Sequence, residues 1–307
     1  MKMPPEHTLR FDSFKMADLH ADETVISIGT SLEERGRIDA WEDLKRADAG
    51  RLVLLQDSGP DTVTVLSEGA PQRVLLTDST RLVSLAKSNK VLIDITTLPH
   101  HVWAPIFQAY LKAGRQVRVL YVEPDGYKTH PSPASDNLFD LSISFGGLSP
   151  LPGFAKLAGP ADDEPSLFIA FLGFEGNRAE RIINQLEPPP RVIPVVGAPG
   201  FQINYPAITV ASNRSFLSDF DCNADIRLAK ASCPFEAFET LASIRRDFPD
   251  HYFYIAPVGT RPHALGALQY AIANESHCEI LFDHPVRQSN RTSGRGLIHI
   301  FSFTPEI

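Results

Sequence analysis

The chain has 307 residues, of which 43% are hydrophobic and 21% are charged, a composition typical of a globular protein with a sizeable core. A formal net charge of −8 excludes a general electrostatic attraction to nucleic acid, and the three cysteines lack the spacing of a zinc site or a disulfide framework. No stretch approaches the ~18 apolar residues of a membrane span or resembles a signal peptide. We therefore expect a cytoplasmic protein with no membrane partner, no metal and no cofactor.

The first half of the chain alternates apolar segments with helical ones after an irregular lead-in over residues 1–22. We expect strands at residues 24–28, 51–56, 62–66, 73–76, 91–96 and 116–122, and helices at residues 37–47, 78–87 and 101–112. From residue 123 to residue 165 the signal weakens. There, residues 139–145 alternate in polarity and could form a strand that returns to the first sheet.

The second half repeats this alternation. We expect strands at residues 166–172, 191–196, 252–256, 279–283 and 297–303, helices at residues 178–186, 235–247 and 264–273, and an extended piece at residues 207–211. Strands that alternate with helices of this length predict a parallel, doubly wound sheet with right-handed crossovers.

One strand–turn–helix–strand pattern occurs twice, at residues 91–124 and at residues 252–285. Its turn reads Thr-x-Pro-His in both copies: Thr97-Leu98-Pro99-His100 and Thr260-Arg261-Pro262-His263. The sequence therefore predicts an α/β fold made of two pseudo-repeated Rossmann-like units, one over residues 1–161 and the other over residues 162–307.

Glycine-containing turns follow the first strand of each predicted unit and are candidate ligand loops. Backbone N–H groups at the start of a helix carry partial positive charge and can bind an anion. The candidates are Gly29, Thr30, Ser31, Gly173 and Glu175. Glu175, like Glu33 in the first copy, could accept hydrogen bonds from a ribose or a base edge. Neither turn matches a dinucleotide fingerprint or a P-loop, so the alternative is a plain strand-to-helix turn.

The Thr-x-Pro-His turns are the stronger candidates, because a neutral imidazole at a helix start can donate to phosphate. They contribute Thr97, His100, Gly259, Thr260, Arg261 and His263. The alternative is that the threonine caps the helix and the histidine is merely solvated. Asp94 lies two residues from the end of an otherwise apolar predicted strand, where an unpaired charge would be costly. We expect it to pair near Arg35 or to accept a capping bond.

The loop over residues 287–296 holds three arginines and no acidic residue, and Arg291 and Arg295 could add to a ligand cleft. Arginine side chains match phosphate oxygens in geometry. This loop is also the one place where we expect that nucleic acid could bind. A solvated hairpin or a protein-contact loop is the alternative.

The run Asp94-Ile95-Thr96 followed by the Thr-x-Pro turn resembles the second ligand motif of CARF-type Rossmann domains, roughly D-x-T-G-G-T-K-x-M. These domains sense cyclic oligonucleotides in prokaryotic antiviral systems, and two fused units look like the SAVED arrangement. In the first copy, the residues that match this motif are Asp94, Thr96 and Thr97. In the second copy the matching residues are Gly259, Thr260 and Arg261. The chain departs from the pattern because no Gly-Gly precedes Thr97 and Leu98 is not basic. We also expect no attached effector domain.

The resemblance implies a sensor of a nucleotide-derived ligand, a cyclic oligonucleotide or related anion, in an antiphage defence or stress-signalling system. It would bind between the two halves and act through a partner protein. One alternative is a ring-nuclease-like phosphodiesterase that uses the His100 and His263 turns. The other alternative is a non-catalytic adaptor or scaffold subunit of a defence complex. No GxSxG or HExxH signature indicates a hydrolase.

Overall fold

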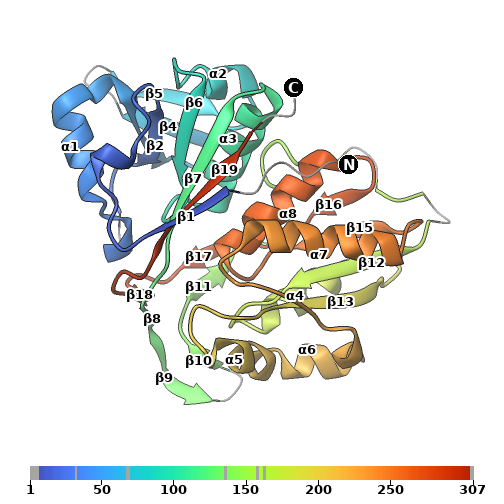
Figure 1. Ribbon diagram of the computed structural model, residues 1–307. Helices are drawn as coiled ribbons and strands as arrows, with labels where there is room; N and C mark the ends of the chain where they lie inside the picture. The colour runs from blue at the N-terminus through green and yellow to red at the C-terminus, as the bar shows by residue number, and fades with distance from the viewer. Residues whose placement is uncertain are drawn as a thin grey trace. The chain divides into compact units, whose positions relative to one another are not determined.

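A computed structural model describes residues 7–31, 33–66, 70–134, 137–156, 159–161 and 164–304. The chain is mixed α/β and forms two compact units (Figure 1). Unit 1 comprises Met1–Gly126 and Ser289–Ile307, and unit 2 comprises Tyr127–Gln288.

This division differs from the expected halves at residues 1–161 and 162–307. The last strand, β19 (Ile298–Phe303), pairs antiparallel with β7 (Gln116–Val122), so the C-terminal segment completes the first sheet. Residues 127–161 belong instead to unit 2. The alternation of apolar and polar residues identifies a strand, but it does not reveal a partner more than a hundred residues away.

Unit 1 is built on an eight-stranded sheet in the order β1-β19-β7-β6-β2-β3-β4-β5. Its remaining strands are β1 (His7–Phe11), β2 (Thr24–Ile28), β3 (Leu52–Asp57), β4 (Thr62–Leu66), β5 (Gln72–Leu75) and β6 (Lys90–Asp94). The central strands β7, β6, β2 and β3 are parallel to one another, and the outer pairs are antiparallel. Its helices are α1 (Asp39–Asp48), α2 (Ser79–Val83) and α3 (His100–Lys112), with 3-10 turns at Met16–Asp18, Glu34–Gly36 and Ala49–Arg51.

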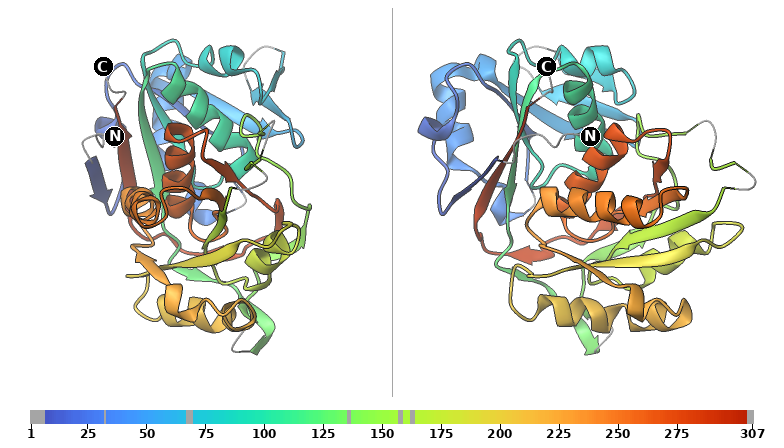
Figure 2. Two further views of the ribbon diagram at one scale, coloured as in Figure 1. Left: turned by 90° about the vertical axis from the view of Figure 1, so that its right-hand side faces the viewer. Right: turned by 45° about the vertical axis from the view of Figure 1, so that its right-hand side comes forward.

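Helices cover both faces of this sheet (Figure 2). Trp41 and Leu44 of α1 pack in one cluster with Val25 and the other side chains on the same face. On the opposite face, Phe107 of α3 contacts Phe303 edge to face, with 5.0 Å between ring centroids. Strands buried on both faces read as nearly continuous apolar runs, which is why the strand at residues 116–122 was predicted correctly and the one at residues 91–96 was found, although β6 ends at Asp94.

Unit 2 is built on a five-stranded sheet in the order β14-β13-β12-β15-β16, with every pair parallel. Its strands are β12 (Ser166–Phe171), β13 (Arg191–Gly197), β14 (Arg227–Ala229), β15 (Tyr252–Ala256) and β16 (Cys278–Ile280). Its helices are α4 (Asn177–Ile183), α5 (Tyr205–Ser212), α6 (Arg214–Asp219), α7 (Pro234–Asp247) and α8 (Arg261–Ala273), with a 3-10 turn at Asn223–Asp225. Helices α4, α5 and α6 lie on one face of this sheet, and α7 and α8 lie on the other (Figure 1).

Short strands complete the chain: β8 (Gly126–Tyr127), β9 (Thr129–Ala134), β10 (Asn137–Phe139), β11 (Ser142–Phe145), β17 (Pro285–Arg287) and β18 (Thr292–Ser293). Three expectations were wrong. The strand at residues 139–145 is two strands, and β11 pairs with β17 instead of the first sheet. Residues 207–211 lie inside helix α5, and β1 lies in the expected irregular lead-in.

Helices α7 and α8 approach each other closely at Gly266. A Cβ atom there would clash with the carbonyl oxygen of Pro234 and would lie 2.9 Å from the Cβ of Ala237. The close approach therefore requires a residue without a side chain.

We expect Gly266→Ala to lower the free energy of unfolding by about 1–3 kcal/mol, because a backbone carbonyl cannot move aside cheaply. The higher helix propensity of alanine, about 1 kcal/mol, offsets part of this loss. Urea unfolding followed by circular dichroism measures the change. Gly50→Ala is the control, since its Cβ would meet Asp48 at an ordinary 3.4 Å. Equal stability of the two variants would contradict the close-packing argument.

Candidate functional site

The turns after β12 and β15 lie side by side in unit 2, as their parallel pairing requires. A Cβ atom on Gly173 would lie 2.9 Å from the carbonyl oxygen of Val258, and one on Gly259 would lie 2.6 Å from that of Leu172. The two turns are thus packed backbone against backbone. These glycines permit a close approach, and the chain itself occupies the space where a ligand was expected.

The corresponding turns of unit 1 also meet. A Cβ atom on Gly36 would clash with Ser31 and would lie 2.7 Å from Cγ2 of Thr97. Ser31 donates a 2.8 Å hydrogen bond to the carbonyl oxygen of Glu33 and accepts one from its N–H. Thr30 is exposed, while Gly29 lies against Leu66.

His100 begins helix α3, as expected, and its ring lies 5.4 Å from that of Trp103. The side chain is half-buried. It therefore lies against the helix that it begins.

The second Thr-x-Pro-His turn is buried from Arg261 to His263, and Thr260 is half-buried. Thr260 caps helix α8 by accepting from the N–H of His263, and it donates a 2.7 Å hydrogen bond to the carbonyl oxygen of Ala231. Arg261 is only 5% exposed. His263 is fully buried; its Nε2 lies 3.1 Å from the carbonyl oxygen of Lys230 and its ring lies 5.2 Å from that of Phe171. The threonine is a cap, as the alternative held, but the histidine is a core residue and is not solvated.

Arg291 is held by Glu33 within unit 1. The Glu33 carboxylate accepts from Nε of Arg35 at 2.7 Å, from Nε of Arg291 at 3.1 Å and from Oγ1 of Thr292 at 2.7 Å. Burial opposes ionisation of Glu33, but the two arginines and the threonine outweigh it and hold its pKa well below the usual range. Arg291 therefore closes a loop, whereas Arg295 is exposed.

Asp94 is an acceptor in the core of unit 1. Its carboxylate accepts from Ser27 at 2.9 Å, from the indole N–H of Trp41 at 3.1 Å and from the backbone N–H of Thr96 at 3.0 Å. Asp94 thus accepts from a backbone N–H of the turn after β6, while Arg35 pairs with Glu33. Since Trp41 belongs to α1, the same carboxylate fixes the turn after β6 and that helix.

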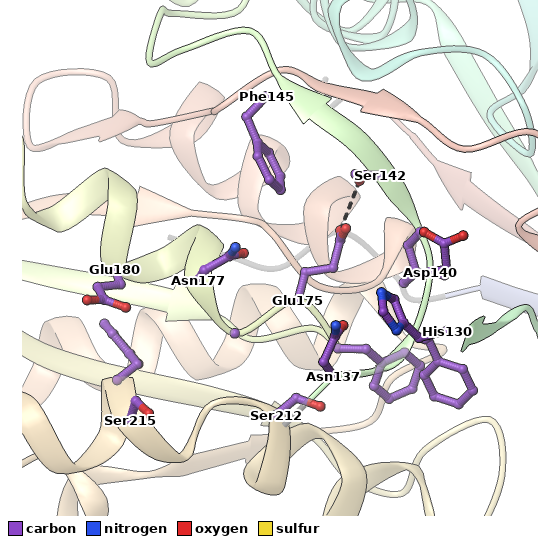
Figure 3. A pocket seen from close by; sticks show the side chains of 15 residues that line it. His130, Asn137, Asp140, Ser142, Phe145, Glu175, Asn177, Glu180, Ser212 and Ser215 are labelled. Atoms are coloured by element: carbon purple, nitrogen blue, oxygen red, sulfur yellow. Dashed lines mark hydrogen bonds between the residues drawn. The ribbon is translucent and has the colours of Figure 1, made fainter. Parts of the chain in front are cut away.

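A pocket of about 420 Å³ in unit 2 lies beside the turn that follows β12. Its described lining comes from β9–β11, from the turn before α4 and from α4–α6. Figure 3 shows Glu175 pointing toward Ser142, whose hydroxyl donates to it at 3.1 Å. In this view Asp140 and His130 lie on the side of β9–β11, and Glu180 lies on the side of α4. Of the expected ligand residues, Glu175 is in the described lining.

The charges around this pocket are partly compensated. Three carboxylates line it, those of Asp140, Glu175 and Glu180, and no lysine or arginine is among its described lining residues. Gln288 and Lys128 both bind Asp140 and lower its pKa, with the Gln288 hydrogen bond the larger cause. Because its acceptors outnumber its cationic groups, the pocket suits a ligand rich in hydroxyl and amino donors better than a phosphate.

Aromatic rings form one wall of this pocket. Phe139 and Phe174 line it, with 4.8 Å between their ring centroids. Tyr205 packs against Phe174 at 5.1 Å, and Tyr127 at 5.2 Å. A planar apolar ring can stack on such a wall while its polar edge reaches the carboxylates.

Unit 1 has its own pocket, of about 330 Å³, at the turn after β2. Gly29, Ser31, Arg37, Glu42 and Lys45 are among its described lining residues. In both units, therefore, a pocket lies at the carboxyl end of the first parallel strand, where ligands of open α/β sheets are usually found.

Most residues of the larger pocket were not predicted from the sequence. Asp140, Ser142 and Phe139 come from residues 127–145, where the pattern of apolar residues was weak. Glu180 and Asn177 belong to a helix that was predicted, so their side of the pocket could have been found from their position after the Gly173 turn. No sequence signal indicated that the two segments meet.

Neither a protein-family model nor a curated protein sequence matches the chain. The described residues contain no group of three or more His, Cys, Asp or Glu side chains that could hold a metal ion. Within the described ranges, no helix has the length and apolar character needed to cross a bilayer.

Burial lowers the pKa of His263 from 6.5 to about 4, against the opposing effect of the backbone bonds to Lys230 and Ala229. The unfolded chain therefore binds a proton at a higher pH than the folded chain does. Between pH 6.5 and pH 4, the fold should lose about 3 kcal/mol through this residue as pH falls.

We expect His263→Gln, which keeps an N–H donor but does not titrate, to show a shallower loss of unfolding free energy over this window. Urea titrations at several pH values compare the two slopes, so any constant cost of the substitution cancels. Parallel slopes would show that His263 is not a buried neutral imidazole.

Proposed function

We propose that this protein is a ligand sensor that binds the nucleoside part of a nucleotide-derived molecule in the 420 Å³ pocket of unit 2. One observation carries the proposal: aromatic rings and hydrogen-bond acceptors converge in a cavity at the carboxyl end of the first parallel strand. The volume lies within the range of about 300–1,000 Å³ found for small-molecule sites.

The chemistry of the lining suits a nucleoside. A base can stack on Phe174 or Phe139, since every base presents a π-face, and such stacking typically contributes about 1–3 kcal/mol. Ribose hydroxyls and exocyclic amino groups are donors, and the carboxylate of Glu175 is a strong acceptor for them. Ser142 already donates to Glu175, which fixes the orientation of that carboxylate before a ligand enters.

The strand orders of the two units support a common ancestry and a Rossmann-like pseudo-repeat. Strands β3-β2-β6-β7 in unit 1 and β13-β12-β15-β16 in unit 2 occupy equivalent places in the order of their sheets. The Thr-x-Pro-His turn lies between β6 and β7 in unit 1 and between β15 and β16 in unit 2. Together with the resemblance to CARF and SAVED sensors, this supports a role in which ligand binding is passed to a partner protein in a defence or stress response.

The surroundings of the second Thr-x-Pro-His turn argue against cleavage through His263. A general acid or base must come within hydrogen-bond reach of the proton that it transfers. His263 is fully buried and its Nε2 is occupied by the carbonyl oxygen of Lys230. The phosphodiesterase alternative would therefore need an imidazole that the fold holds in the core.

A thermal-shift and calorimetry panel of nucleosides, nucleotides and cyclic oligonucleotides tests the proposal. We expect at least one nucleoside to raise the melting temperature; a ligand at 100 times its Kd should add ~2.7 kcal/mol of stability. Glu175→Gln should weaken binding about tenfold or more, because a charge-assisted hydrogen bond contributes about 1.5–3 kcal/mol.

Glu279→Gln is the matched control, since Glu279 is a partly buried glutamate on β16 outside the described lining. It should leave the affinity unchanged. The proposal is refuted if no nucleoside or nucleotide stabilises the wild-type protein at millimolar concentration, or if both glutamate variants bind like wild type.

A further inference from the structure

We infer that the nucleoside pocket continues past Phe145 into a second, smaller pocket that binds the phosphate of the same ligand through Arg181. This inference rests on the proposed function and names the ligand class more closely: a phosphorylated nucleoside, either free or as one unit of an oligonucleotide. Arg181, which was not among the ligand residues predicted from the sequence, then has an anion-binding role.

Phe145 joins the two cavities. It is the last residue of β11, and its ring lines both the pocket of about 420 Å³ and a neighbouring pocket of about 230 Å³. The smaller cavity lies below the usual size of a small-molecule site. It is large enough for a phosphate and its ester oxygen. The two cavities therefore fit one ligand in two parts better than they fit two ligands.

Arg181 provides the cation of the smaller pocket. Its guanidinium lies over the Phe145 ring, 4.7 Å from the centroid, and the side chain is exposed. Stacking on an aromatic face occupies the plane of a guanidinium and leaves its N–H groups at the edge, where they can bind two phosphate oxygens at once. The aromatic ring thus holds the arginine in place before a ligand binds.

The neighbouring arginine cannot serve this purpose. Arg178 makes a bidentate ion pair with Asp283, with Nε 2.9 Å from Oδ2, and donates to the carbonyl oxygen of Val258 at 3.0 Å. Asp283 also lines the smaller pocket, but its negative charge is compensated by Arg178. Arg181 then determines the local potential, and that potential favours an anion.

The opposite charges of the two pockets favour different parts of one ligand. Carboxylates line the larger pocket and disfavour a phosphate there, while Arg181 favours one next to it. Helix α4 contributes one charged residue to each pocket: Glu180 lines the larger pocket and Arg181 lines the smaller one. Adjacent helical residues point about 100° apart. One short helix can therefore present an acceptor to the ribose side and a donor to the phosphate side of one ligand.

The test compares the Kd of a nucleoside with the Kd of its 5′-monophosphate, for the base that binds best in the panel above, by calorimetry at low and at physiological salt. We expect wild type to bind the monophosphate at least tenfold more tightly, with the preference shrinking as salt rises. Arg181→Ala should abolish this preference and leave nucleoside affinity within about twofold. Arg181→Lys should retain part of it.

Arg191→Ala is the matched control. Arg191 also lies over a phenylalanine ring, 5.1 Å from the Phe248 centroid, but at the start of β13, the other end of the strand from the pocket turns. This variant should keep the phosphate preference. Unchanged far-ultraviolet circular dichroism of Arg181→Ala checks that the exposed substitution leaves the fold intact.

The outcomes separate the two proposals. Nucleoside binding without a phosphate preference in wild type, or a preference that survives in Arg181→Ala, overturns this inference alone. Failure of every nucleoside and nucleotide to bind overturns the proposed function and this inference together.

Discussion

The buried ion pair between Arg178 and Asp283 is the interaction on which the arrangement of unit 2 depends. Arg178 joins helix α4 to the segment after β16 through Asp283 and to the turn after β15 through Val258. Its guanidinium also lies 3.7 Å from Glu175 and faces the rings of Phe145 and Phe282. Removing one partner of such a pair typically costs about 3–5 kcal/mol, because the other charge is left buried without compensation. The pocket wall and the sheet edge are therefore stabilised by the same arginine.

Local sequence pattern was enough to find most of the parallel strands and most of the helices between them, but not β14, α5 or α6. Residues 91–96 and 252–256 are apolar because both faces of their sheets are covered by helices, and this burial leaves a signal in the sequence itself. Residues 127–145 leave no such signal. Their strands are short and half-exposed, and β11 is completed by β17, some 140 residues later. Strand pairing at that distance depends on the whole fold, and the composition of a short stretch of sequence does not predict it.

The candidate residues show the same limit at the level of single side chains. The sequence offered capping as the alternative role of Thr260, and this role could be foreseen because it depends on neighbours within one turn. Whether the His263 side chain faces solvent or the core depends instead on what surrounds α8, and that helix is buried over Arg261–Ala271. Glu33 shows the converse: it was considered as a ribose acceptor, yet Arg35, Arg291 and Thr292 already occupy its carboxylate. Burial and pairing, which sequence cannot give, determine which polar residues remain for a ligand.

The rule that ligands bind beyond the carboxyl ends of parallel strands holds for this chain only in a modified form. At Gly173 and Gly259 that crevice is closed, because the two turns touch through their backbones. The cavity lies to one side, where β9–β11 adds a second wall facing the turn after β12 and the helix α4. The segment with the weakest sequence signal therefore supplies Asp140, Ser142 and Phe145 to the site. A shared α/β scaffold fixes where a site can form, and the inserted segment determines what that site can bind.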